Sequence, residues 1–132
     1  MAWNNDIGKI GEQLSQKYLR EKGYAILETN WRLGRMEADI IAYQEGVIVF
    51  VEVKTRSSVL FGEPQEFVDE KKQKSYIRMA NAYVQMKHRT EEVRFDIIAI
   101  EVSHTGYQLN HIENAFYAMD LWQKPGRRKT LF

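Results

Sequence analysis

The chain has 132 residues, of which 44% are hydrophobic and 28% are charged, and its formal net charge is +1. This mixture excludes a disordered polyelectrolyte, and only 8 Gly and 2 Pro exclude a collagen-like or low-complexity chain. The absence of cysteine excludes a disulfide framework and a thiolate metal site.

No segment has the character of a membrane span or an export signal. The longest apolar run, residues 47–51, is far shorter than the roughly 20 residues of a transmembrane helix. The first residues lack the apolar stretch of a secretory signal. We therefore expect a cytoplasmic protein with one domain over residues 1–117. The basic segment 118–132 is expected to be a flexible tail.

The N-terminal half is predicted to form a helix and three strands. Apolar residues recur at helical spacing over residues 6–22, at Ile7, Ile10, Leu14 and Tyr18. Strands are expected over residues 24–31, 37–43 and 47–54. A polar loop separates the first two strands, and a short Gln-Glu-Gly turn separates the last two.

The C-terminal half is predicted to form a second helix and two strands. A loop over residues 55–68 leads to Asp69, a plausible N-cap for a helix that reaches about residue 87. Strands follow over residues 93–102 and 107–112, and the first of them is apolar enough to be buried on both faces. The second helix can carry the chain across the sheet, so the fourth strand should run parallel to the third. The sequence therefore predicts an α/β layer fold.

Charged residues interrupt the apolar third strand. Glu52 and Lys54 are two positions apart and therefore project from one face. Burying such charges costs on the order of several kcal/mol unless they are paired or bound to a metal. If residues 45–46 form a two-residue hairpin turn, Asp39 lies directly opposite Glu52, with Cβ atoms about 4.5–5.5 Å apart.

Two interpretations of these opposed carboxylates are open. Facing carboxylates destabilise a bare sheet, and a divalent cation such as Mg²⁺, which prefers hard oxygen ligands, would reverse that effect. Lys54 would then reach a phosphate oxygen or a metal-bound water, an arrangement typical of phosphodiester hydrolysis. The alternative is a cross-strand ladder of salt bridges that also includes Glu37.

The spacing of Asp39, Glu52 and Lys54 resembles the PD-(D/E)xK signature of metal-dependent nucleases, with Ala38 in place of the leading proline. A longer set of residues resembles the YraN-type family of small, largely uncharacterised bacterial proteins with a predicted nuclease fold: Gly11-Glu12, Asn30-Trp31-Arg32, residues 50–56, Lys72, residues 94–96 and residues 111–116. The arrangement is also similar to archaeal Holliday junction resolvases. This resemblance implies a restriction-endonuclease-like αβββαβ core with a central mixed sheet flanked by helices.

The resemblance also implies roles for individual residues. Asp39 and Glu52 would be ligands of Mg²⁺ or Mn²⁺, Lys54 the catalytic lysine, and Glu12 the helix glutamate. From the helix alone, Glu12 lies roughly 150° from the apolar stripe and would be solvated. Glu37 either extends the acidic cluster or forms an ion pair with Lys54.

Basic and hydroxyl residues flank the proposed site in sequence and are expected to hold phosphate oxygens, with solvated surface charge as the alternative for each: Arg32, Arg35, Arg56, Ser57 and Lys72. Asp96 is expected to pair with Arg94. The leading hypothesis is a Mg²⁺- or Mn²⁺-dependent DNA endonuclease, acting on branched DNA by the resolvase resemblance and compatible with a homodimer. The alternative is a nucleic-acid-binding module of the same fold that does not cleave. A glycosidase is disfavoured because Lys54 would have no role in it.

Overall fold

The computed structural model describes residues 2–57 and 68–116, with side chains from residue 7 onward. Two helices and five strands follow one another along the chain: α1 (Ala2–Glu21), β1 (Ala25–Leu33), β2 (Met36–Gln44), β3 (Val47–Ser57), α2 (Glu70–Met86), β4 (Glu92–Ser103) and β5 (Gly106–Phe116). This is the predicted order of helix, three strands, helix and two strands. The expected C-terminal tail lies outside the described residues.

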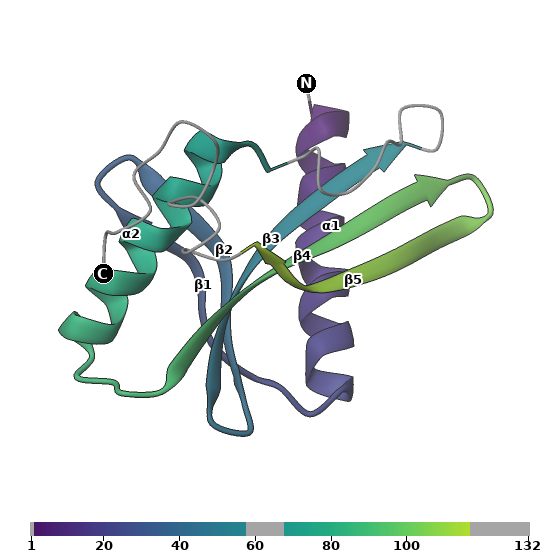
Figure 1. Ribbon diagram of the computed structural model, residues 1–132. Coiled ribbons are helices and arrows are strands. Elements are labelled where there is room, and N and C mark those ends of the chain that lie inside the picture. The colour runs from purple at the N-terminus through teal and green to yellow at the C-terminus, as the bar shows by residue number, and fades with distance from the viewer. Residues whose placement is uncertain (1, 58–67, 117–132) are drawn as a thin grey trace.

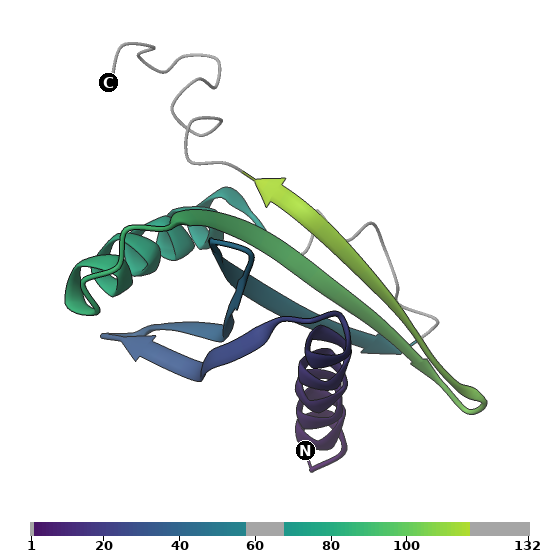
Figure 2. The same cartoon turned by 90° about the horizontal axis from the view of Figure 1, so that it is seen from below.

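The strands form one mixed sheet in the order β1-β2-β3-β4-β5 (Figure 1). β1, β2 and β3 form an antiparallel meander, whereas β4 pairs parallel to β3 and antiparallel to β5. The parallel pair confirms the predicted crossover through α2. Figure 2 shows that α1 and α2 cover opposite faces of the sheet. The fold is therefore α/β, with a helix on each side.

Each helix encloses its own apolar cluster against the sheet. Phe50 and Phe95 pack with Tyr76 and Tyr83 on the α2 face. A second cluster, on the α1 face, consists of Leu19, Tyr24, Ile40, Ala42, Val49, Val51, Ile98 and Ile100. The residues of β4 from Phe95 to Ile100 are all buried, which confirms that this strand is covered on both sides.

The β2–β3 turn fixes the register of the central hairpin. Glu45 and Gly46 both have positive φ, 50° and 83°, as a two-residue turn of the type that matches strand twist requires. Gln44 pairs with Val47, and the ladder continues without a shift to Ile40 and Val51. The predicted register is therefore confirmed over these five pairs.

Several predicted boundaries are wrong because cross-strand pairing extends the strands. β3 continues to Ser57, beyond the predicted end at residue 54, since residues 55–57 pair with β4. The β1–β2 connection is a tight turn rather than a five-residue loop, because Leu33 pairs with Met36. β5 likewise runs to Phe116, four residues past its predicted end.

The buried face of α1 also differs from the predicted stripe. From Ile7 onward, the buried residues of this helix are Gly11, Ser15 and Leu19, whereas Ile10 is 46% exposed. A Cβ on Gly11 would lie 1.9 Å from Thr55 Oγ1, so the helix packs on β3 through small residues at close range. Within the described ranges, neither helix is long and apolar enough to span a membrane.

Candidate active site

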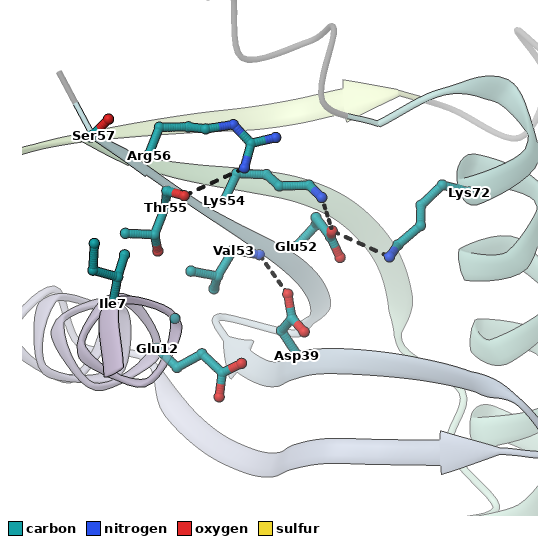
Figure 3. Close-up of a pocket in the computed structure, with 11 residues that line it drawn as sticks. Ile7, Glu12, Asp39, Glu52, Val53, Lys54, Thr55, Arg56, Ser57 and Lys72 are labelled. Carbon is teal, nitrogen blue, oxygen red and sulfur yellow. Dashed lines mark hydrogen bonds and ion pairs between the residues drawn. The ribbon is translucent and has the colours of Figure 1, made fainter. Parts of the chain in front are cut away.

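A pocket opens where β2 separates from β3, between the two helices (Figure 3). Four elements line it: α1 with Ile7, Gly8 and Glu12, β2 with Asp39, β3 with residues 52–57, and α2 with Lys72. The pocket thus contains the charged residues of the predicted motif. It also includes a residue of α1 that helix periodicity alone assigned to solvent.

Where β2 separates from β3, the side chain of Asp39 replaces a main-chain carbonyl as the hydrogen-bond acceptor for β3. The β2–β3 ladder ends at Ile40 and Val51, one pair before Asp39 and Glu52. Asp39 Oδ2 accepts a hydrogen bond of 2.8 Å from the backbone N–H of Val53. The two carboxylates therefore face the same pocket, as predicted, although the ladder does not pair them directly.

Glu52 is buried and surrounded by donors. Its side chain is 4% exposed, and Oε2 lies 3.4 Å from Lys54 Nζ and 3.4 Å from Lys72 Nζ. Its other oxygen, Oε1, accepts a hydrogen bond of 2.5 Å from the Tyr76 hydroxyl. Two ammonium groups and a phenol thus stabilise the charge of this carboxylate.

Asp39 lacks such compensation. Among the described residues, no lysine, arginine or histidine forms an ion pair with it. Burial and the nearby Glu52 charge raise the pKa of Asp39 to about 8, although the Val53 hydrogen bond and Lys72 act in the opposite direction. The pocket therefore holds one compensated and one uncompensated carboxylate.

Glu12 enters the pocket because α1 lies so close to β3. The buried line through Gly11, Ser15 and Leu19 is centred about 60° from Glu12 on the helix, rather than on the far side. Glu12 Oε1 also accepts a hydrogen bond of 3.3 Å from Asn30 Nδ2. Asn30 has a φ of 51°, a conformation that asparagine adopts more readily than most residues. Periodicity alone predicted a solvated side chain, whereas the structure places Glu12, half-buried, in the lining of the pocket.

The predicted phosphate-binding residues separate into two groups. Arg56, Ser57 and Lys72 line the pocket. Arg32 and Arg35 are exposed at the β1–β2 hairpin and do not contribute to the pocket lining. The structure therefore brings only the first group together with the carboxylates.

Glu37 does not belong to the acidic cluster. It pairs with Arg32 on β1, both by register and through an ion pair of 3.4 Å. Pairing with Lys54 is wrong, because the β2–β3 ladder ends before it reaches Glu37. Of the proposed salt-bridge ladder only the pair of Glu52 and Lys54 is present, because Glu37 pairs with Arg32 and Asp39 has no ion-pair partner in the described part of the chain.

Two residues of the site were not anticipated from sequence. Tyr76 appeared to be an ordinary core residue of α2, yet its hydroxyl also lies 3.4 Å from the backbone N of Asp39, as the acceptor. Its position four residues after Lys72 places both on one side of the helix, which is a usable signal. Thr55 was assigned to a loop, but it lies in β3 beneath Gly11.

A second buried carboxylate lies on the α1 face of the sheet. Asp96 accepts two hydrogen bonds of 2.9 Å from Arg94, which confirms the expected pair. His111 Nε2 lies 2.7 Å from the same carboxylate, and the backbone N–H of Asn114 donates to it at 3.1 Å. His111 Nδ1 contacts the Tyr18 hydroxyl at 3.0 Å, so this cluster connects α1 with β4 and β5.

The donor chemistry of the pocket fits a hard divalent cation. No group of three or more His, Cys, Asp or Glu side chains gathers into a ligand set within residues 2–57 and 68–116. Mg²⁺ commonly uses one or two carboxylates and keeps several waters, so Asp39 and Glu52 are sufficient in number. The raised pKa of Asp39 is the electrostatic strain that a bound cation would relieve.

Comparison with known proteins gives consistent matches. The family model described as "Uncharacterised protein family UPF0102" matches residues 11–100. A UPF0102 protein of Flavobacterium psychrophilum is 49% identical over 117 residues, which cover 89% of this chain and 98% of the relative. UPF0102 proteins of Alkaliphilus oremlandii and Bacteroides thetaiotaomicron are 47% and 45% identical, over 86% and 89% of this chain and 99% and 97% of their own lengths.

Proposed function

Because the chain belongs to the uncharacterised protein family UPF0102, whose name states no activity, we propose a function from the chain's own residues. We propose that the protein is a metal-dependent DNA endonuclease that hydrolyses phosphodiester bonds. In this proposal the αβββαβ part of the chain is a restriction-endonuclease-like core. Two features support that assignment: the order of the elements, and the position of the carboxylates at the divergence of the central hairpin.

One observation carries the proposal. Asp39 and Glu52 face one open pocket, with Lys54 two residues beyond Glu52 on the same strand. A structural cluster would be expected to neutralise both carboxylates, but Asp39 has no ion-pair partner among the described residues and its pKa is raised to about 8. Uncompensated acidic groups beside lysines in a cleft are typical of functional sites.

The two carboxylates, Lys54 and Tyr76 have separate tasks in this proposal. Asp39 and Glu52 would hold Mg²⁺ or Mn²⁺, which when bound supplies positive charge to the phosphate and acidity to a water. Lys54, whose side chain is 25% exposed, would bind a nonbridging phosphate oxygen at the scissile bond. Tyr76 keeps Glu52 in place through its hydrogen bond, and Glu12 lies on the α1 wall within the same pocket.

The test is a cleavage assay on duplex, single-stranded, flap and four-way-junction DNA, with Mg²⁺, Mn²⁺ or EDTA. We expect metal-dependent cleavage that falls at least about 100-fold in Asp39→Asn and Lys54→Gln, the scale of losing a catalytic group. Glu92→Gln, an exposed carboxylate of β4, is the matched control and should cleave like the parent. The four-way junction arm tests the resolvase-like preference that the sequence resemblance suggests.

Two results would contradict this function. If every DNA remains intact with either metal, the protein is not a nuclease on these substrates. Tight DNA binding in that case, with no heat of Mg²⁺ binding in calorimetry, would support the non-catalytic module instead. Cleavage by Asp39→Asn at the parent rate would also overturn the assignment of the site.

A further inference from the structure

The two helical walls of the pocket differ in charge. α1 contributes Ile7, Gly8 and the carboxylate of Glu12, so none of its described side chains places a cation in the lining. α2 contributes Lys72, whose side chain is 43% exposed. A phosphate chain that leaves the pocket is therefore repelled on the α1 side and attracted on the α2 side.

The outward face of α2 continues this positive charge. Lys71, Lys74 and Arg78 follow at positions i, i+3 and i+7, so they share one face of the helix. With Ser75 and Glu70 they line a shallow groove, in which Lys74 forms an ion pair of 3.7 Å with Glu70. Lys71 and Arg78 have no ion-pair partner within the described ranges. The groove thus carries three cations and one carboxylate.

The groove and the pocket lie next to each other on the same helix. Lys72, which contacts Glu52, follows Lys71 and is rotated by about 100° around the helix axis. From Lys71 to Arg78 the helix rises about 10 Å, at 1.5 Å per residue. One DNA strand advances about 3.4 Å per nucleotide, so the groove matches the length of about three nucleotides.

We propose that the Lys71–Lys74–Arg78 face of α2 is the binding surface for the DNA backbone next to the cleavage site. This inference rests on the proposed nuclease function and adds the path of the bound strand. The strand passes from Arg56 and Ser57 on β3, across the carboxylates, to Lys72 and then along α2. The α1 helix covers the other face of the sheet and borders this path only at the pocket, which it lines with Ile7, Gly8 and Glu12 (Figure 1).

The experiment compares two triple variants that remove the same charge. Lys71→Gln/Lys74→Gln/Arg78→Gln alters the α2 face, and Lys17→Gln/Arg20→Gln/Lys22→Gln alters three exposed cations in the last turns of α1 and the turn that follows it. Every protein also carries Asp39→Asn, so that DNA is not cut. Binding of a fluorescent 20-base-pair duplex is followed by anisotropy across a range of NaCl concentrations, and circular dichroism checks that each variant folds.

The α2 variant should bind at least tenfold more weakly at 0.1 M NaCl. The slope of log affinity against log salt is negative, and its magnitude should become smaller by about 2–3, since each lost phosphate contact contributes about 0.9. The α1 variant should change the slope by less than 1. If both variants weaken binding equally, or if the α2 variant binds like its parent, the proposed surface is wrong. If the unaltered protein still cleaves DNA in that case, the nuclease proposal stands. If the protein neither cleaves nor binds DNA, both proposals are overturned.

Discussion

Asp39 on β2 and Asp96 on β4 belong to one sheet, and their surroundings shift the pKa of the two carboxyls in opposite directions. Asp96 receives Arg94, His111 and a backbone N–H. Burial acts to raise its pKa, but the hydrogen bonds from His111 and Arg94 outweigh burial and hold the pKa below its usual range. Asp39 receives one backbone N–H, and its pKa is raised to about 8.

This difference separates a carboxylate whose charge is compensated by hydrogen bonds from one whose charge is not. A buried charge with complete hydrogen bonding stabilises the arrangement around it, and removing one partner is costly. A buried carboxylate beside another carboxylate destabilises the protein when it ionises. The comparison therefore predicts opposite responses to the same aspartate-to-asparagine change.

The largest expected effect is at Asp96. Asp96→Asn should destabilise the protein by roughly 3 kcal/mol, because it leaves Arg94 and His111 without their shared acceptor. Urea unfolding at pH 7 measures this loss. The loss should begin to shrink only below about pH 3.8, where the carboxyl of the unfolded chain binds a proton, and should vanish as pH falls through the lowered pKa of Asp96 in the folded protein.

An ion pair on the surface of the protein provides a matched control for Asp96→Asn. Arg89 and Glu91 form an ion pair at 2.7 Å that is much more exposed than Asp96. Glu91→Gln should cost much less than Asp96→Asn, because exposed ion pairs contribute little to stability. If Asp96→Asn costs no more than this control, Asp96 has no special part in the fold.

An intermediate effect is expected where α1 contacts the site. Gly11→Ala should destabilise the protein by roughly 2 kcal/mol, because the added methyl group would overlap Thr55 Oγ1. Gly8→Ala is the control, since a Cβ there meets nothing within 4 Å. It should be neutral or stabilising by up to about 1 kcal/mol. Thermal melts of both variants measure this difference in stability. Equal melting temperatures would disprove the close contact between Gly11 and Thr55.

Asp39→Asn should produce an effect of the opposite sign, and its magnitude should depend on pH. The folded protein binds a proton at Asp39 up to about pH 8, whereas the unfolded carboxyl loses it near pH 3.8, so stability of the metal-free parent falls as pH rises between these values. Asparagine removes this loss. In EDTA at pH 8 the variant should be more stable by at least ~1.4 kcal/mol, the equivalent of one pKa unit.

The gain in Asp39→Asn should disappear at pH 4, where the parent carboxyl is protonated in the folded protein. Melting temperatures measured from pH 4 to pH 8 provide this internal control. A variant that is less stable than the parent at pH 8 would mean that Asp39, like Asp96, serves the fold. The contrast between the two aspartates would then be lost.

The sequence predicts the order of the elements and the central register because both depend on local signals. Alternating apolar residues give the strands, and Glu45-Gly46 gives a two-residue turn. Those signals place Asp39 and Glu52 on one pocket. Lys72 was also anticipated, because it is one of the residues that resemble the YraN-type family. Only the fold, however, brings its ammonium group to Glu52.

The rest depends on packing that local patterns do not encode. The buried line of α1 follows Gly11 and Ser15, small residues that a hydrophobic stripe overlooks, and this rotates Glu12 into the pocket. The hydrogen bond from the backbone N–H of Asn114 to Asp96 lies at the register irregularity of the β4–β5 pair, which local patterns do not predict. The end of the β2–β3 ladder at Ile40 likewise decides that Glu37 pairs with Arg32.

The parallel seam between β3 and β4 bears on the order in which the protein folds. β1, β2 and β3 join through short turns, whereas Val47 pairs with Glu92, a partner 45 residues away. Long-range pairings form slowly because loop closure must precede them. Lys72 and Tyr76 reach Glu52 from the segment that closes this seam, so we expect the complete pocket to form late, after the meander. Pulse-labelled hydrogen exchange during refolding would show this as protection of β2 before β4.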